Sequence, residues 1–203
     1  MNAYQGWISL ETLGQIWVMQ TLKRIGLYGV SGVGKTTILN ELIQLSSNIL
    51  WLEGSSLVLD AANLTLEKFK DLPETQKYRF REMAISNAIE IQKSKNQHVI
   101  IDGHLAFARG ENEFENVMTE MDKMFYTDFV YLKLSPITIL ERQEKDLLRN
   151  RSYSLETITN WQKFELSELE KVCEEKNIGL YVTESERNKD CMELILKTIF
   201  DTR

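Results

Sequence analysis

Cysteine, histidine and proline are scarce in this chain of 203 residues, which contains two of each. The two cysteines, Cys173 and Cys191, form no CxxC pair, so the sequence argues against a closed zinc site. A disulfide framework is not expected at this length either. Because two free thiols suit a reducing compartment, we expect a cytoplasmic protein.

Long apolar runs are also missing, so no segment is expected to cross a membrane. The chain is 43% apolar and 27% charged, which is typical of a globular protein with a core and excludes a disordered chain. The formal net charge of −6 argues against a nucleic-acid partner, although it leaves room for a local basic pocket.

Residues 1–22 precede the first predicted strand and lack the basic and apolar regions of a signal peptide. Their apolar positions permit a rough amphipathic helix, which would be a capping or dimerising element. The alternative is an irregular, disordered extension, which we favour. The oligomeric state stays open.

From Lys23 onward, predicted strands and helices alternate, which indicates a parallel α/β sheet with helices on both faces. The sequence shows no internal repeat and no long linker, so we expect a single domain over 23–203. The predicted strands are 24–30, 49–52, 98–102, 128–134 and 178–182. The predicted helices are 36–45, 73–95, 115–125, 136–148, 155–176 and 188–200.

The strongest motif is GVSGVGKT, residues 29–36, which fits the phosphate-binding pattern G-x-x-x-x-G-K-[ST] and stands between a strand and a helix. Backbone N–H groups of such a loop surround phosphate oxygens, and the helix N-terminus adds its positive dipole. Lys35 would contact the β- and γ-phosphates of ATP, and the Thr36 hydroxyl would bind Mg²⁺. The expected nucleotide-binding residues are Gly29, Ser31, Gly32, Val33, Gly34, Lys35, Thr36 and Thr37.

Other classes of phosphate-loop protein fit less well. The GTPase motif N-K-x-D is absent, because Asn188-Lys189-Asp190 lacks the spacer residue. The chain is too short for a typical ring ATPase with a lid domain. A small-molecule kinase is the simplest remaining class.

Asp102 ends the predicted strand 98–102, and ligands bind at the carboxyl ends of parallel strands. Its carboxylate could hold Mg²⁺ or accept a proton from the attacking group; alternatively, it only starts a turn with Gly103. His104 could orient a phosphate or cap that turn. His98, at the other end of the strand, is interpreted as structural.

Arginines cluster around the predicted end of the helix 136–148. Arg142 and Arg149 share one helical face, and Arg151 follows where a lid would start. Arginines stabilise the charge that develops during phosphoryl transfer, so we expect Arg142, Arg149 and Arg151 to be catalytic. The alternative is a solvated charged face.

These motifs together resemble the adenylate-kinase-like nucleotide kinases, in particular the archaeal-type adenylate kinases. GVSGVGKTT is similar to the family's phosphate loop, LPETQ (72–76) to a segment before its third strand, IDGH (101–104) to its D-x-H, and LLRNRSYSLE (147–156) to its arginine lid. The resemblance covers about residues 24–183, and only the phosphate loop is highly specific.

The resemblance implies a five-stranded parallel sheet in the order 2-3-1-4-5, with ATP and Mg²⁺ as donor and a nucleoside monophosphate as acceptor. It also implies an acceptor-binding insert at about 54–80 and a short lid at about 142–156. Lys35 and Thr36 would hold the phosphates and the metal, with Asp102 at the D-x-H position. Arg149 and Arg151 would be the two lid arginines.

The acceptor segment matches the family poorly. Arg79, Arg81 and His104 are candidate acceptor-binding residues, and the two arginines are equally explained as surface charges. Three functions therefore stay open: a nucleoside monophosphate kinase, a kinase of the same fold for another metabolite or a nucleic-acid end, and an ATPase switch that acts on a partner. The first is our main prediction.

Overall fold

The computed structural model describes residues 22–146, 153–184 and 186–200. Its centre is a five-stranded parallel sheet in the order β2-β3-β1-β6-β7. Counted within this sheet alone, the order is 2-3-1-4-5, as predicted. The strands are β1 (Arg24–Tyr28), β2 (Ile49–Glu53), β3 (His98–Asp102), β6 (Asp128–Leu132) and β7 (Gly179–Thr183).

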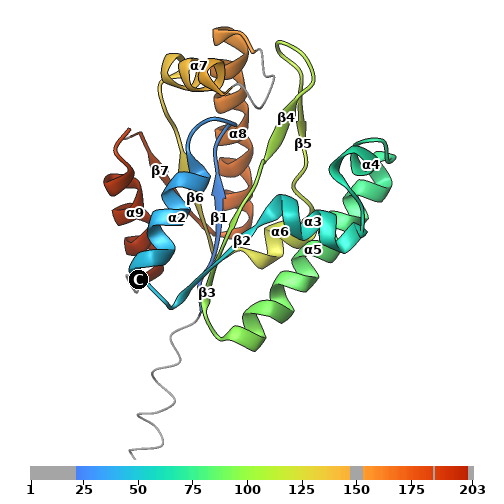
Figure 1. The fold of residues 1–203 in the computed structure, drawn as a ribbon, viewed down its shortest axis with the longest axis vertical. Helices are drawn as coiled ribbons and strands as arrows, with labels where there is room; N and C mark the ends of the chain where they lie inside the picture. Colours follow the sequence, from blue (N-terminus) through green and yellow to red (C-terminus); the bar gives the residue numbers. More distant parts are fainter. Residues whose placement is uncertain (1–21, 147–152, 185, 201–203) are drawn as a thin grey trace, which may run out of the picture.

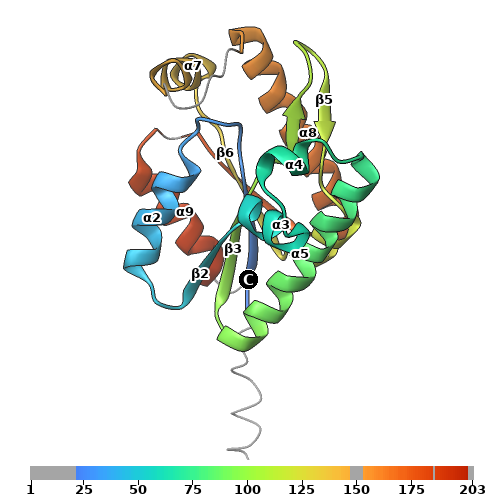
Figure 2. The same ribbon diagram turned by 45° about the vertical axis from the view of Figure 1, so that its right-hand side comes forward.

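Helices cover both faces of this sheet (Figure 1; Figure 2). One face carries α2 (Lys35–Leu45) and α9 (Asn188–Phe200), and the other carries α5 (Glu74–Lys95), α6 (Glu120–Phe125) and α8 (Leu155–Lys176). The helix α7 (Pro136–Lys145) lies beyond the carboxyl edge of the sheet. The three-layer α/β class predicted from the alternation is therefore confirmed.

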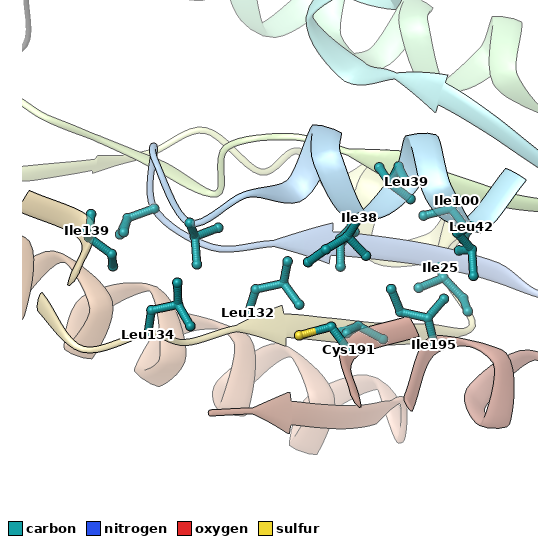
Figure 3. Packing of buried hydrophobic residues seen from close by; sticks show 14 of the residues in the cluster. Ile25, Ile38, Leu39, Leu42, Ile100, Leu132, Leu134, Ile139, Cys191 and Ile195 are labelled. Atoms are coloured by element: carbon teal, nitrogen blue, oxygen red, sulfur yellow. The ribbon is translucent and has the colours of Figure 1, made fainter. Parts of the chain in front are cut away.

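The core beneath α2 shows why these segments pack as they do. Ile38, Leu39 and Leu42 project from α2 onto Ile25 and Ile100 of the sheet (Figure 3). Spacings of three and four residues place the α2 side chains on one face, and complete burial removes them from water. Cys191 and Ile195 of α9 complete this layer, and both cysteines are buried and form no disulfide with each other.

The segment between β3 and β6 corrects one prediction. Residues 115–125 are not one helix: β5 (Phe114–Asn116) pairs antiparallel with β4 (Ala106–Ala108), and α6 begins only at Glu120. The Thr119 hydroxyl accepts the Asp122 N–H, and the Asp122 carboxylate accepts the Thr119 N–H. This capping box fixes the start of α6 at Glu120, so the residues before it are outside the helix and β5 can pair with β4.

Other boundaries also shift. The first strand ends at Tyr28 rather than at residue 30, the fourth ends at Leu132, and α7 ends at Lys145 rather than at 148. Two helices that the sequence did not predict, α3 (Gly54–Ala62) and α4 (Leu66–Lys70), lie within the proposed acceptor insert. In the described part of the chain, no helix combines the length and the apolar character that a membrane span requires.

Candidate functional site

The predicted phosphate loop connects β1 to α2 at the carboxyl edge of the sheet. Its glycines have a backbone that other residues rarely adopt, with φ of 144° at Gly29 and 104° at Gly34. A Cβ atom on Gly29 would lie 2.6 Å from the Leu132 carbonyl oxygen. The helix α2 begins directly after Gly34, which has a left-handed backbone. The first N–H groups of the helix thus adjoin the loop, which is the arrangement expected of an anion-binding site.

Lys35 is only 9% exposed and belongs to this loop. Its Nζ donates a hydrogen bond to the Gly29 carbonyl, so the ammonium group is held inside the curve of the loop. Thr36 and Thr37 are exposed next to it and line the adjoining cavity. The residues present therefore fit a nucleoside triphosphate with its Mg²⁺.

The helix α7 packs against the phosphate loop from beyond β6. The Arg142 guanidinium donates to the Val33 carbonyl at 3.0 Å, and the Gln143 amide donates to the Ser31 carbonyl at 2.6 Å. Arg142 thus contacts the backbone of the phosphate loop, and its catalytic role stays a prediction. Gln143, which is 4% exposed, was not predicted; it orders the loop backbone.

Asp102 lies beside the phosphate loop because β3 is the neighbour of β1. Strand register places it opposite Glu53 of β2 and Leu27 of β1. The Trp51 indole N–H donates to its Oδ1 at 2.7 Å. Burial raises the pKa of Asp102, and the Trp51 hydrogen bond and the Lys35 charge oppose this only in part. A buried carboxylate is thus fixed within the field of the loop lysine.

A cavity of about 610 Å³ extends from this phosphate site, and we call the part of it that lies away from the phosphate loop the second chamber. Its phosphate end is lined by Lys35, Thr36, Arg142 and Asp102, and its far end by residues of α3, α4, α5 and the β4–β5 hairpin. Two predicted acceptor residues, Arg81 and His104, line this cavity. Arg79 does not: it is exposed on α5 and is not among the lining residues.

The polar groups of the second chamber are mostly acidic. Arg81 is its one cation among the described residues, and this side chain forms an ion pair with Glu74. Glu53 and Asp122 line the same chamber, and Asp102 lies where the chamber meets the phosphate end. Burial also raises the pKa of Asp122, which the Thr119 hydrogen bonds and the charge of Arg81 oppose. Among the described residues that line this chamber, acidic side chains therefore outnumber cations, whereas Lys35 and Arg142 lie at the phosphate end.

Glu165 is a further buried acid that the sequence did not single out. It projects from α8 with no exposed surface and accepts hydrogen bonds from the Ala106 N–H at 3.2 Å and the Tyr131 hydroxyl at 3.0 Å. Burial raises its pKa from 4.5 to about 7, against the opposing charge of Lys35. It links α8 to the chain that follows Asp102.

The pKa of Glu165 gives a testable pH dependence. Its pKa is 4.5 in the unfolded chain and about 7 in the folded one, so the unfolded chain ionises first as the pH rises. Stability is then lost between these values, by about 3 kcal/mol of unfolding free energy. Glu165→Gln, whose amide oxygen still accepts the Ala106 N–H, should not show this loss. Urea unfolding at several pH values measures it.

The difference between wild type and Glu165→Gln isolates this effect, because the contributions of Asp102 and Asp122 are the same in both proteins. A difference that stays constant from pH 4.5 to 7.5 would contradict the assignment.

The structure does not bring together every predicted residue. Arg149 and Arg151 lie outside the described residues, as do residues 1–21, so the lid and the extension stay predictions. His98 is buried at the opposite end of β3, where its Nδ1 accepts the Lys23 N–H at 3.0 Å. In the described ranges, no group of three or more His, Cys, Asp or Glu residues could hold a metal ion.

Comparison with known proteins gives one family match. A protein-family model described as an AAA domain matches residues 28–162, which include the phosphate loop, Asp102 and Arg142. No curated protein matches the sequence at a significant level.

Solved structures with a similar fold include two shikimate kinases and a sugar kinase. The shikimate kinase from Acinetobacter baumannii, in complex with shikimate, has a TM-score of 0.57 at 18% identity, over 89% of this chain and 94% of that one. The enzyme from Bacteroides thetaiotaomicron has a TM-score of 0.51 at 14% identity, over 89% and 99%. A sugar kinase from Janibacter sp. has a TM-score of 0.55 at 16% identity, over 89% and 95%. These likenesses show a shared fold.

Proposed function

Because the chain belongs to the AAA domain family and has the fold of P-loop kinases, we propose that it transfers the γ-phosphoryl group of ATP to a small-molecule acceptor. One observation carries this proposal. A single cavity of about 610 Å³ is lined by the phosphate loop and Asp102 at one end and continues as the second chamber, and its total volume lies within the range of ligand-binding pockets. A simple hydrolase has no need of that chamber.

The residues of the site would have separate roles in phosphoryl transfer. The loop N–H groups and Lys35 would hold the β- and γ-phosphates, and Arg142 would stabilise charge on the group in transit. Thr36 and Asp102 would hold Mg²⁺, which neutralises phosphate charge when bound. Gln143 and Arg142, through the Ser31 and Val33 carbonyls, keep the loop in its binding shape.

The chemistry of the second chamber favours a hydroxyl acceptor. The hydroxyl oxygen forms a bond to the γ-phosphorus, the bond from that phosphorus to the β-phosphate oxygen breaks, and ADP leaves. The hydroxyl proton needs a base, and Asp102 is a carboxylate at the boundary between the two chambers. Glu53, opposite it in the strand register, is a second proton acceptor.

A nucleoside monophosphate, which the sequence resemblance implies, is the second candidate acceptor. Arg81 favours it, because this arginine lines the chamber and its partner Glu74 is 45% exposed at the side chain. A phosphate could therefore replace Glu74 as the partner of Arg81. In that case the acceptor is already ionised, and Asp102 is needed for the metal rather than as a base.

The test is ADP production from ATP with a panel of hydroxyl compounds and nucleoside monophosphates, against a sample without acceptor. We expect ADP formation to depend on one acceptor class and the product to carry the phosphoryl group. Turnover of a hydroxyl compound supports the first candidate, and turnover of a monophosphate supports the second. Hydrolysis at the same rate with and without every acceptor would contradict the proposal and favour a partner-driven ATPase switch.

A further inference from the structure

The helices α3 and α4 are unusual because neither has a buried residue, although their sequences are GSSLVLDAA and LEKFK. An apolar helix normally packs its apolar face against the core. Here Leu57 packs partly against the core, and large apolar side chains of both helices also line the cavity. The ones that line it are Leu57, Val58, Leu59, Leu66 and Phe69.

The β4–β5 hairpin and the chain that leaves it supply further apolar lining of the same chamber. Phe107 of β4 lines it and is 37% exposed, and Val117 and Met118 follow β5. Figure 1 shows the β4–β5 hairpin and α4 on opposite sides of the region above α3. Leu66, at the start of α4, is 46% exposed. Large apolar side chains on separate elements thus face one hollow and stay in contact with water.

Two aromatic rings in this wall are held in place by neighbours. Phe69 packs against Phe80 of α5, with ring centroids 6.5 Å apart. Phe107 packs against His104, with centroids 5.3 Å apart. Pre-positioned rings favour a flat aromatic partner, because such rings gain from offset or edge-to-face contacts beyond the area that they bury.

We infer that this wall, formed by Leu66, Phe69 and Phe107, binds an aromatic ring carried by the acceptor, whose hydroxyl group reaches toward Asp102. The inference rests on the proposed phosphoryl transfer and specifies its substrate class. Hydroxyl groups of a polyol that lay against Leu66 and Phe69 would lose water without gaining hydrogen bonds there, although Glu53 and Asp122 elsewhere in the chamber could bind other hydroxyl groups. The site therefore differs in substrate class from one that accepts a sugar.

The experiment uses matched pairs of acceptors that share a hydroxyl group and differ in the ring. Nucleosides are compared with free pentoses, and 2-phenylethanol with glycerol, while ATP consumption and the phosphorylated product are measured. We expect kcat/KM to be at least about 10-fold higher for the ring-bearing member of each pair. The nucleoside and the aryl alcohol arms show which ring the site prefers. Preference for the pentoses, for glycerol or for shikimate would overturn the inference.

Two substitutions test the wall itself, and the exposure of both side chains makes a folding defect improbable. Leu66→Ser and Phe107→Ala should each raise the KM for the ring-bearing acceptor about 10-fold and leave the KM for ATP unchanged. Leu45→Ser is the matched control, because Leu45 is 64% exposed at the end of α2 and outside the cavity. If Leu66→Ser and Phe107→Ala behave like Leu45→Ser, the wall does not bind the acceptor.

Binding without turnover separates this inference from the proposed function. The affinity of each nucleoside and of 2-phenylethanol is measured by calorimetry in the presence of a non-hydrolysable ATP analogue. If Leu66→Ser weakens this binding and the assay with ATP itself gives no phosphorylated product, the result supports the ring site and contradicts the kinase proposal. Equal affinity for ring-bearing and ring-free members of each pair overturns the ring site, whatever the turnover.

Discussion

Lys35→Met is expected to lower ATP turnover by about 10²- to 10³-fold, because it removes a positioned cation from the group on which charge develops. The methionine side chain is of similar length and apolar, so it can occupy the buried path of the lysine stem. The Gly29 carbonyl loses its Nζ donor, and the loop keeps its bonds from Arg142 and Gln143. Steady-state kinetics with the preferred acceptor measures the effect.

The matched control for Lys35→Met is Lys93→Met, because the Lys93 side chain is 68% exposed on α5, away from the cavity. Thermal unfolding with and without ATP separates a binding defect from a folding defect. We expect Lys93→Met to keep full activity and its stabilisation by ATP, and Lys35→Met to lose both. Normal turnover by Lys35→Met would contradict the nucleotide assignment itself.

The phosphate loop and the central sheet could be predicted because their signals are local. The glycine and lysine spacing of residues 29–36 defines one backbone shape, and alternating strands and helices permit few topologies. The position of Asp102 followed from the same logic. Carboxyl ends of parallel strands share one edge, so a carboxylate at the end of a strand next to β1 lies near the loop.

The helix predicted over 115–125 was wrong because short segments carry little periodicity. Three residues, Phe114–Asn116, are enough for a strand when a partner strand is present, and Ala106–Ala108 is that partner. The signal that could have found the boundary is Thr119 with Asp122, a capping box that starts a helix later than the predicted one.

The helices α3 and α4 were missed for a different reason. The helix α3 begins at Gly54, where a Cβ atom would lie 2.6 Å from the Asp102 carbonyl oxygen. A side chain would clash there, so this helix starts with a glycine and lacks a usual helix-start signal. The Ser56 hydroxyl donates to the Glu53 carboxylate at 2.7 Å at this same start. The close approach of two strands sets this requirement, and the local sequence does not show it.

The residues that support the site were missed because their partners are distant in the chain. Trp51 donates a hydrogen bond to Asp102, Gln143 donates one to the Ser31 carbonyl, and Glu165 accepts one from the Ala106 N–H. Each contact depends on the order of strands and on how α7 and α8 return over the sheet edge. A glutamine or tryptophan in an amphipathic segment has no motif that distinguishes a site-supporting role from ordinary packing.

Asp102→Asn is expected to lower kcat by about 10²- to 10⁴-fold, the range found when a positioned proton acceptor is lost. The amide oxygen can still accept the Trp51 N–H, so the substitution removes the negative charge with little change in the packing around it. Trp51→Phe is the converse variant: it removes the hydrogen bond and keeps the carboxylate, and we expect a far smaller loss. Asp71→Asn, at an exposed position outside the cavity, is the neutral control.

The dependence of Asp102→Asn on Mg²⁺ concentration then separates its two candidate roles. If Asp102 mainly holds the metal, the variant needs more Mg²⁺ for half-maximal rate, and high Mg²⁺ restores part of kcat. If Asp102 mainly accepts the hydroxyl proton, kcat stays low at every Mg²⁺ concentration, because added Mg²⁺ does not replace the missing base. A kcat equal to that of Asp71→Asn would exclude both roles and leave the carboxylate as part of the Trp51 packing at the end of β3.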